Sequence, residues 1–176
     1  MPADSTAIVE SGLDFPMAAR IRFRRETNDD ESFLLRLYAT TRAEEMELTG
    51  WDAAQKEAFL RMQFQFQTTH YRRYFADAAF QIILLDEAPI GRLYVHYGTS
   101  EIRLMDVALI PERRGAGIGS WILHTLLTQA ERSQNRVTLH VEKHNRALRL
   151  YQRFKFRVVE DQGVNLYMQS PGRSCM

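Results

Sequence analysis

The sequence predicts an α/β (α+β) domain in which helices cover one mixed β-sheet. Three observations support this fold class. The chain has 176 residues, the length of a single domain of ordinary size. Apolar residues make up 45% and charged residues 26%, which are globular proportions and exclude disorder of the whole chain. Segments with the two-residue period of strands alternate with segments that have the 3.6-residue period of helices.

The domain is expected to span residues 20–176, preceded by a flexible N-terminal arm at residues 1–19. The arm is rich in small residues and shows no hydrophobic period. From residue 20 onward, no linker, internal repeat or long run of like charge divides the chain. The sequence therefore predicts one core and one domain.

A strand and a helix open the domain. Ile21 and Phe23 alternate with arginines, as in a half-buried strand. The polar run from Asn28 supplies cap-type and acidic residues at a helix start, and an apolar face follows from Phe33 to Tyr38. The order of these signals predicts a strand followed directly by a helix.

A second helix is predicted after Asp52. Phe59, Met62 and Phe66 recur at three- and four-residue spacing, so they lie on one helical face. Large apolar residues of this region would either line an acceptor pocket or, at helical spacing, pack in the core: Met46, Trp51, Met62, Phe64, Phe66 and Tyr71.

The rest of the chain predicts six further strands and two further helices. The strands are expected at residues 80–85, 90–97, 102–109, 137–141, near 155–160 and at 164–169. One helix begins near Ile118, where apolar residues recur one turn apart. Asn145 can cap a second, shorter helix.

Charge and composition exclude several classes of protein. The net charge is +1, which gives no reason to expect nucleic-acid binding. No apolar stretch approaches the roughly 18–20 residues that span a membrane, and the first 19 residues do not resemble a secretory signal. The single cysteine, Cys175, cannot form an internal disulfide, so a cytoplasmic location is expected. No neighbouring residue would activate its thiol, so Cys175 is not expected to be a nucleophile.

The most informative segment is the glycine-rich turn between the 102–109 strand and the following helix. Gly115, Gly117 and Gly119 alternate there, directly after two arginines. Closely spaced glycines let the backbone turn so that several N–H groups point inward together. The start of the helix adds free N–H groups and the positive end of its dipole. The turn therefore predicts a phosphate or pyrophosphate site, although a plain strand-to-helix connection has similar glycines.

Two known classes of phosphate site fit this turn poorly. A P-loop needs a lysine after its last glycine, and no lysine lies between Lys56 and Lys143. A nicotinamide-dinucleotide fingerprint needs a third glycine at the position of Ser120. Only 34 residues follow Glu142, which is too few to complete a doubly wound sheet.

The segment from Leu109 to Gly119 resembles the Arg/Gln-x-x-Gly-x-Gly motif of the GNAT superfamily of acyl-CoA-dependent N-acyltransferases. A second segment, from Leu139 to Phe156, is similar to the strand and short helix near the carboxyl end of that family. One departure is visible, because Lys155 stands where the family usually has glycine. The resemblance implies a mostly antiparallel sheet flanked by about four helices.

The resemblance also implies a site for acetyl-CoA, used as a co-substrate. The end of one strand would pair its backbone with the pantetheine arm, at Val107, Ala108 and Leu109. The glycine-rich segment would hold the pyrophosphate, through Arg114, Gly115, Ala116, Gly117, Ile118, Gly119 and Ser120. Asn145 would contact the cofactor from the second motif. Homodimers are common in that family, so the resemblance also implies that the chain can form a homodimer.

Direct acyl transfer to an amine requires an acid and a base. Tyr151 matches the tyrosine that protonates the leaving thiolate in the family, although it also shares a face with core residues. His140 lies where some members carry a glutamate, so it is either the base or a structural histidine. Asp106, predicted on the strand face of Ile102 and Leu104, is either structurally paired or poised for proton transfer.

The acceptor is expected to be an amine of a small molecule or a peptide. Residues 26–57 hold nine acids and three bases, which would attract a cationic amine or simply form a solvated face. His140 and His144 have a spacing that metals use, but no thiol accompanies them, so no metal site is predicted. The alternative function is a non-catalytic acyl-CoA-binding sensor or interaction module on the same fold.

Overall fold

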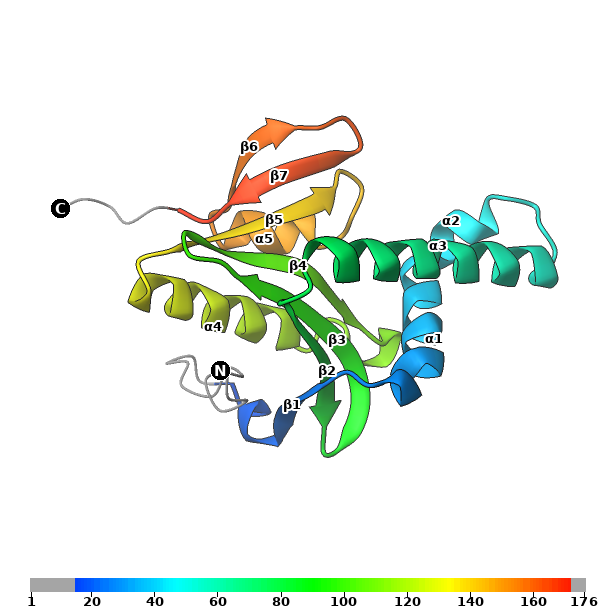
Figure 1. The fold of residues 1–176 in the computed structure, drawn as a ribbon, viewed down its shortest axis with the longest axis horizontal. Coiled ribbons are helices and arrows are strands. Elements are labelled where there is room, and N and C mark those ends of the chain that lie inside the picture. The colour runs from blue at the N-terminus through cyan, green and yellow to red at the C-terminus, as the bar shows by residue number, and fades with distance from the viewer. Residues whose placement is uncertain (1–14, 172–176) are drawn as a thin grey trace.

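One seven-stranded sheet, in the order β1-β2-β3-β4-β5-β7-β6, forms the framework of the domain (Figure 1). The computed structural model describes residues 15–171. The strands are β1 (Ile21–Arg25), β2 (Ala79–Leu85), β3 (Ala88–Tyr97), β4 (Glu101–Leu109), β5 (Arg136–Glu142), β6 (Arg157–Asp161) and β7 (Asn165–Gln169). The helices are α1 (Glu31–Thr41), α2 (Ala43–Glu47), α3 (Ala53–Tyr74), α4 (Ile118–Arg132) and α5 (Leu148–Arg153). The mixed α/β fold predicted from the sequence is confirmed.

The sheet is antiparallel except where β4 and β5 pair in parallel. Their register runs from Glu101 opposite Arg136 to Leu104 opposite Leu139 and stops there. β4 continues for five residues and β5 for three residues beyond this last pair. The two strands run apart toward α1 and α2 (Figure 1), so the outer half of β4 pairs only with β3.

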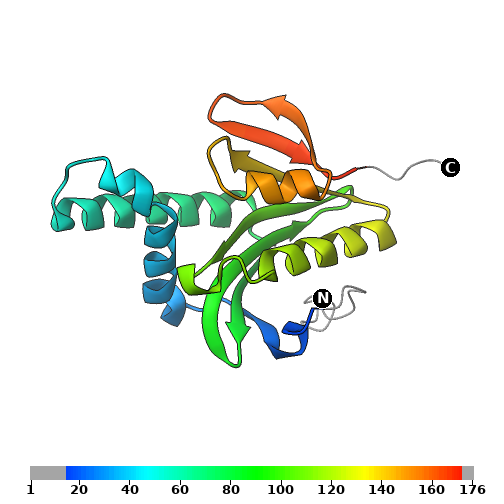
Figure 2. The same ribbon diagram turned by 180° about the vertical axis from the view of Figure 1, so that it is seen from behind.

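Helices cover both faces of the sheet, with α1 and α3 on one side and α4 and α5 on the other (Figures 1 and 2). The larger core lies between the sheet and α4, where Trp121, Ile122 and Leu126 are almost fully buried. A smaller cluster on the opposite face joins Leu34 and Phe64 to residues of β2. None of the described helices has the length and apolar character needed to cross a membrane.

Five α-helices are present rather than four, because the sequence pattern does not reveal α2. With five residues, α2 is too short to show a hydrophobic period. Its buried residue, Met46, is 7% exposed. The helix follows α1 after a single residue, Arg42, and turns the chain toward α3.

The apolar face predicted for α3 exists, but it points away from the core. Phe64 is the buried residue of this helix, at 5% exposure, whereas Met62 is 44% and Phe66 is 65% exposed. Trp51 is also exposed and packs edge-on against Phe59. Trp51, Met62 and Phe66 therefore do not pack in the core, so that interpretation of their helical spacing is wrong for these three residues. Spacing alone does not say which of two apolar faces meets the sheet.

The last residues of the predicted arm lie against the domain. Phe15 stacks on Trp121, with ring centroids 5.8 Å apart. Met17 and Ala18 also pack against the larger core. Residues 1–14 and Cys175 fall outside the described part of the chain.

A close contact between β3 and β4 requires glycine at position 91. A Cβ atom added to Gly91 would lie 2.3 Å from the backbone oxygen of Ala108, closer than real atoms approach. We expect Gly91→Ala to lower the free energy of unfolding by about 1–3 kcal/mol, measured by urea denaturation. Gly119→Ala is the matched control, since its Cβ would make ordinary contact with Leu150 at 3.4 Å. Equal stability of the two variants would contradict the assignment.

Candidate active site

The ends of β4 (residues 105–109) and β5 (residues 140–142) do not pair with each other and leave a separation between the two strands, which we call the opening. The glycine-rich turn follows the β4 side of this opening. β4 ends at Leu109, a short 3-10 helix covers Pro111–Arg113, and α4 begins at Ile118. Gly115 and Gly117 have φ values of 75° and 86°, a left-handed conformation that favours glycine. Residues 111–117 are all exposed, so the turn is open to solvent.

Six consecutive backbone amides in this turn have no acceptor within the described chain. The first backbone bond of α4 runs from the Trp121 amide to the Gly117 oxygen, at 3.0 Å. Among residues 15–171, no oxygen accepts from the amides that precede it, those of Gly115, Ala116, Gly117, Ile118, Gly119 and Ser120. These donors lie at the positive end of the α4 dipole, so the segment can bind an anion with more than one phosphoryl group.

Arg114 braces the turn against two other elements. Its Nε donates to the backbone oxygen of Leu109 at 2.9 Å, at the end of β4. Its Nη2 donates to the hydroxyl of Thr40 at 2.8 Å, in the last turn of α1. The arginine predicted to contact a cofactor therefore also fixes the anion site relative to β4 and α1.

Asp106 does not share a face with Ile102 and Leu104, which corrects the expectation from strand alternation. The β3–β4 register shifts between Tyr94 and Val95: Val95 pairs with Leu104, but Tyr94 pairs with Asp106. Neighbouring residues of β3 face opposite sides of the sheet, so their partners do too. Met105 is the extra residue of this bulge, and it moves Asp106 to the α1 and α3 face.

On that face Asp106 belongs to a buried polar cluster that sequence reasoning missed. Arg92, whose side chain is 3% exposed, donates to Asp106 at 2.5 Å and to Gln67 at 2.8 Å. The Tyr71 hydroxyl donates to the backbone oxygen of Met105 at 3.3 Å. Two residues of the bulge are therefore bonded to this cluster: Asp106 through its side chain and Met105 through its backbone oxygen. Only the bulge brings these residues together, so the alternation in the sequence could not reveal the cluster.

Tyr151 approaches the opening from the opposite face of the sheet. It lies on α5, is 6% exposed and packs beside Phe156. Burial raises the pKa of its phenol well above the ordinary value of 10, and the negative charge of Asp106 adds to this shift. Tyr151 therefore keeps its proton at neutral pH, and the two predicted site residues are electrostatically coupled.

His140 lies on the exposed face of β5, opposite the core side of Leu139 and Val141, as predicted. Its ring stacks on Tyr167 of β7 with centroids 4.9 Å apart. Partial burial lowers its pKa below 6.5, and the charge of Arg103 acts in the same direction. The imidazole is therefore neutral at pH 7 and able to accept a proton.

Two ion pairs join the α1–α2 region to the segment that follows β5. Arg42, between α1 and α2, lies 3.0 Å from the carboxylate of Glu142 at the end of β5. Glu44 of α2 pairs with Arg146 in the segment that follows. These contacts join the α1–α2 corner to the β5–α5 connection. Neither pair has a local sequence signal, because the partners lie about 100 positions apart.

Asn145 lies between β5 and α5, within the second segment that resembles the family. Its side-chain oxygen accepts a hydrogen bond from the Ala147 amide at 2.8 Å, just ahead of α5. The N-cap residue of α5 is Ala147, which makes no side-chain capping bond, so Asn145 forms a turn ahead of the helix and is not the cap that the sequence predicted. Among the described residues, no group of three or more His, Cys, Asp or Glu side chains could hold a metal ion.

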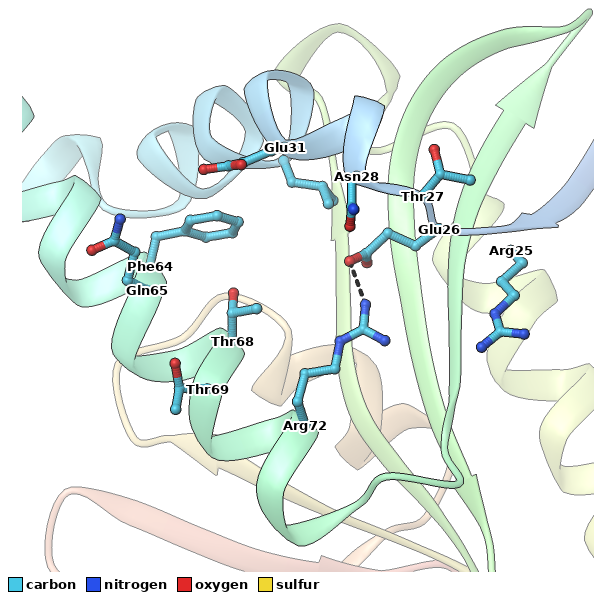
Figure 3. A pocket seen from close by; sticks show the side chains of 11 residues that line it. Arg25, Glu26, Thr27, Asn28, Glu31, Phe64, Gln65, Thr68, Thr69 and Arg72 are labelled. Carbon is cyan, nitrogen blue, oxygen red and sulfur yellow. Dashed lines mark hydrogen bonds and ion pairs between the residues drawn. The ribbon is translucent and has the colours of Figure 1, made fainter.

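A separate pocket of about 470 Å³ lies between β1, α1 and α3 (Figure 3). Arg72 reaches across it to Glu26, with a contact of 2.7 Å, and the Tyr94 hydroxyl donates to the other carboxylate oxygen at 2.5 Å. None of the predicted catalytic or cofactor-binding residues lines this pocket. Phe64, one of the apolar residues that the sequence offered for an acceptor pocket, does line it, together with Glu26 and Glu31 of the acidic 26–57 region. The pocket is therefore distinct from the opening between β4 and β5.

The fold and this site define an α/β domain with an exposed glycine-rich turn at the start of a helix, and comparison with known proteins identifies the family. The model of the acetyltransferase (GNAT) family matches residues 40–156, about two thirds of the chain. The chain belongs to this family. A search of the curated proteins found no match.

Solved structures share this fold at low sequence identity. The PaiA N-acetyltransferase from Thermoplasma acidophilum, solved with coenzyme A, is 20% identical and has a TM-score of 0.60; the match covers 85% of this chain and 98% of that one. An acetyltransferase from Thermus thermophilus is 20% identical, with a TM-score of 0.62 and coverage of 86% and 96%. Arabidopsis thaliana Naa50, solved with the bisubstrate analogue CoA-Ac-MVNAL, is 16% identical, with a TM-score of 0.53 and coverage of 87% and 99%.

Replacing one amide in the turn tests the anion site. Gly119→Pro removes a backbone N–H in the first turn of α4, where proline is tolerated, while Gly119→Ala keeps that N–H. We expect the proline variant to bind coenzyme A about tenfold or more weakly than the alanine variant, measured by calorimetry. The thermal midpoints of the two variants should be similar. Equal affinities would show that this amide does not contact the ligand.

Proposed function

We propose that this chain moves an acetyl group from acetyl-CoA to an amine of a small molecule or a peptide by direct attack. The observation that carries the proposal is the run of six amides without an acceptor, within the described chain, beside the opening between β4 and β5. Family membership supports the use of an acyl-CoA. The lone cysteine supports a reducing, cytoplasmic setting.

The residues present fit acetyl-CoA along one continuous path. Amides 115–120 are free to hold the diphosphate, with Arg114 fixing the turn in place. Val107, Ala108 and Leu109 lie beyond the last β4–β5 pair, so their backbone is open to an extended pantetheine arm. Asn145 borders the opening at the end of β5, where it would contact the cofactor. When bound, the thioester supplies an activated acetyl group.

In the proposed reaction, the neutral amine nitrogen bonds to the thioester carbonyl carbon. The carbonyl oxygen becomes an oxyanion, which a backbone amide near the β4 bulge stabilises. The carbon–sulfur bond then breaks, and the thiolate takes a proton from the Tyr151 hydroxyl. The phenol is protonated at neutral pH, as a proton donor must be, and it regains a proton from solvent before the next turnover. Burial raises its pKa, so the buried phenol is a weaker acid than a free tyrosine.

The proton lost by the amine goes to His140, directly or through water. Its lowered pKa keeps the imidazole neutral at pH 7. Asp106 is the poorer base, because protonating it would leave the buried Arg92 guanidinium without its charged partner. We therefore assign Asp106 to the site as the residue that anchors the bulge and acts electrostatically on Tyr151.

The reaction is tested by measuring thiol release from acetyl-CoA with a panel of polyamines, amino acids, aminoglycosides and peptides. Tyr151→Phe should lower kcat by about 10²–10⁴-fold with little change in the KM for acetyl-CoA. Tyr97→Phe is the matched control, since it removes a hydroxyl that lies 3.4 Å from Gln129 of α4. Binding of acetyl-CoA without turnover on any amine would instead favour an acyl-CoA sensor.

The pH dependence tests the base. A base whose pKa is lowered is inactive only when protonated, so kcat/KM should rise with pH through a limb below pH 6.5. His140→Gln should lower kcat/KM and remove this limb. His144→Gln, an exposed histidine four positions away, should retain it. A limb that persists in the His140 variant would exclude His140 as the base.

A further inference from the structure

A phenylalanine that precedes β1 lies against the glycine-rich turn. A Cβ atom added to Gly117 would lie 3.2 Å from Cε2 and 3.8 Å from Cδ2 of Phe15. Within residues 15–171, Phe15 is the one residue distant in sequence that comes within 4 Å of that position. It also lies outside residues 40–156, which the family model matches, so the family pattern does not account for this contact.

Two aromatic residues from outside α4 stack on Trp121, in the first turn of that helix. Phe15 lies 5.8 Å from Trp121, centroid to centroid, with an interplanar angle of 22°. Phe23 of β1 lies 6.1 Å from it, with an angle of 15°. The Trp121 amide also donates the first backbone bond of α4 to the Gly117 oxygen. Phe15 therefore contacts both residues that form this bond.

Local hydrogen bonds hold the backbone around Phe15. Its oxygen accepts from the Ala18 amide at 2.9 Å, and the Met17 oxygen accepts from the Arg20 amide at 2.9 Å. Arg20 is in turn paired with Asp86, in the connection between β2 and β3. The fold therefore sets the position of the Phe15 ring, and the ring does not depend on a ligand for its place.

The Phe15 ring covers one side of the turn and leaves another side open. Gly117 remains exposed although the ring lies beside it. Its φ of 86° is one of many conformations that glycine can adopt, so contacts from outside the turn are needed to select it. Arg114 supplies such contacts at the beginning of the turn, through Leu109 and Thr40. Phe15 supplies one near its end.

We propose that Phe15 is a positioning residue for the diphosphate of the acyl-CoA: its ring, fixed on Trp121, holds Gly117 in the left-handed conformation in which the amides of residues 115–120 are free to bind the ligand. The inference rests on the coenzyme A site proposed above. Holding a binding loop in its bound conformation raises affinity, because less ordering is left to the binding step. Phe15 acts through the turn, so its loss should weaken diphosphate binding and leave the chemical step unchanged.

Calorimetry with coenzyme A tests this role. Phe15→Ala should bind coenzyme A about tenfold more weakly than the native chain, because the turn must then be ordered on binding. Met17→Ala is the matched control: Met17 also packs against the larger core, but it does not approach Gly117, so the affinity should stay native. Equal affinities of the two variants would overturn the inference.

A donor without a diphosphate separates positioning from general loosening of the fold. Phe15→Ala should raise the KM for acetyl-CoA about tenfold and leave kcat unchanged. Its kcat/KM for S-acetylpantetheine, which lacks the diphosphate, should equal that of the native chain. An equal loss with both donors would show that Phe15 supports the fold alone.

These measurements also distinguish failure of the inference from failure of the proposed function. If the native chain binds coenzyme A but acetylates no amine, the transfer reaction is wrong, while calorimetry still decides the role of Phe15. If the native chain binds no coenzyme A, the proposed site and the inference fail together.

A double-variant cycle tests the contact itself. Gly117→Ala should weaken coenzyme A binding in the native chain, both through its positive φ and through the Phe15 ring. In a Phe15→Ala background the loss should be smaller, because the ring is gone while the φ is the same. Additive losses would show that the two residues do not act together.

A conservative variant covers the case in which Phe15→Ala fails to fold. Phe15→Leu keeps an apolar side chain against the core but removes the flat ring that stacks on Trp121. It should fold and bind coenzyme A about threefold more weakly than the native chain. Native affinity in this folded variant would overturn the inference.

Discussion

The separation of β4 from β5 after a short parallel pairing is the constraint on which the site depends. Strand pairing satisfies backbone groups, so ending it at Leu104 and Leu139 leaves one edge of β4 available to another extended chain. The glycine-rich turn follows at the end of the same strand and contributes amides that have no acceptor among residues 15–171. The opening and the anion site are consequences of one departure from regular sheet structure.

The β4 bulge is a second departure, and it links the two faces of the sheet. By inserting Met105, it places Asp106 among Arg92 and Gln67 on the α1 and α3 face. Tyr151 approaches from the other face, yet the charge of Asp106 still raises the pKa of its phenol. The proposed acid, acting from the core side, and the proposed base, His140 on the open side, therefore flank a single opening. This arrangement suits a reaction that moves one proton at each end of a transferred group.

Ion pairs tie the segments around the opening together without contributing much to overall stability. Exposed pairs such as Arg146 with Glu44 are worth little individually. Arg42 with Glu142 is better shielded and joins α1 to the end of β5. These ion pairs fix the position of the α1–α2 corner relative to the connection between β5 and α5.

Sequence alone determined the order of the seven strands along the chain, the positions of the four longer helices and the glycine-rich turn after β4, because these depend on local periodicity and backbone freedom. It placed His140 on the open face of β5 for the same reason. Tertiary structure decided which face of the sheet or core each side chain meets, because local periodicity does not determine it. The register shift turned Asp106 to the other face, and contact with the sheet buried Phe64 while leaving Phe66 in solvent. Alternation predicts that a face exists, but only packing selects which face meets the core.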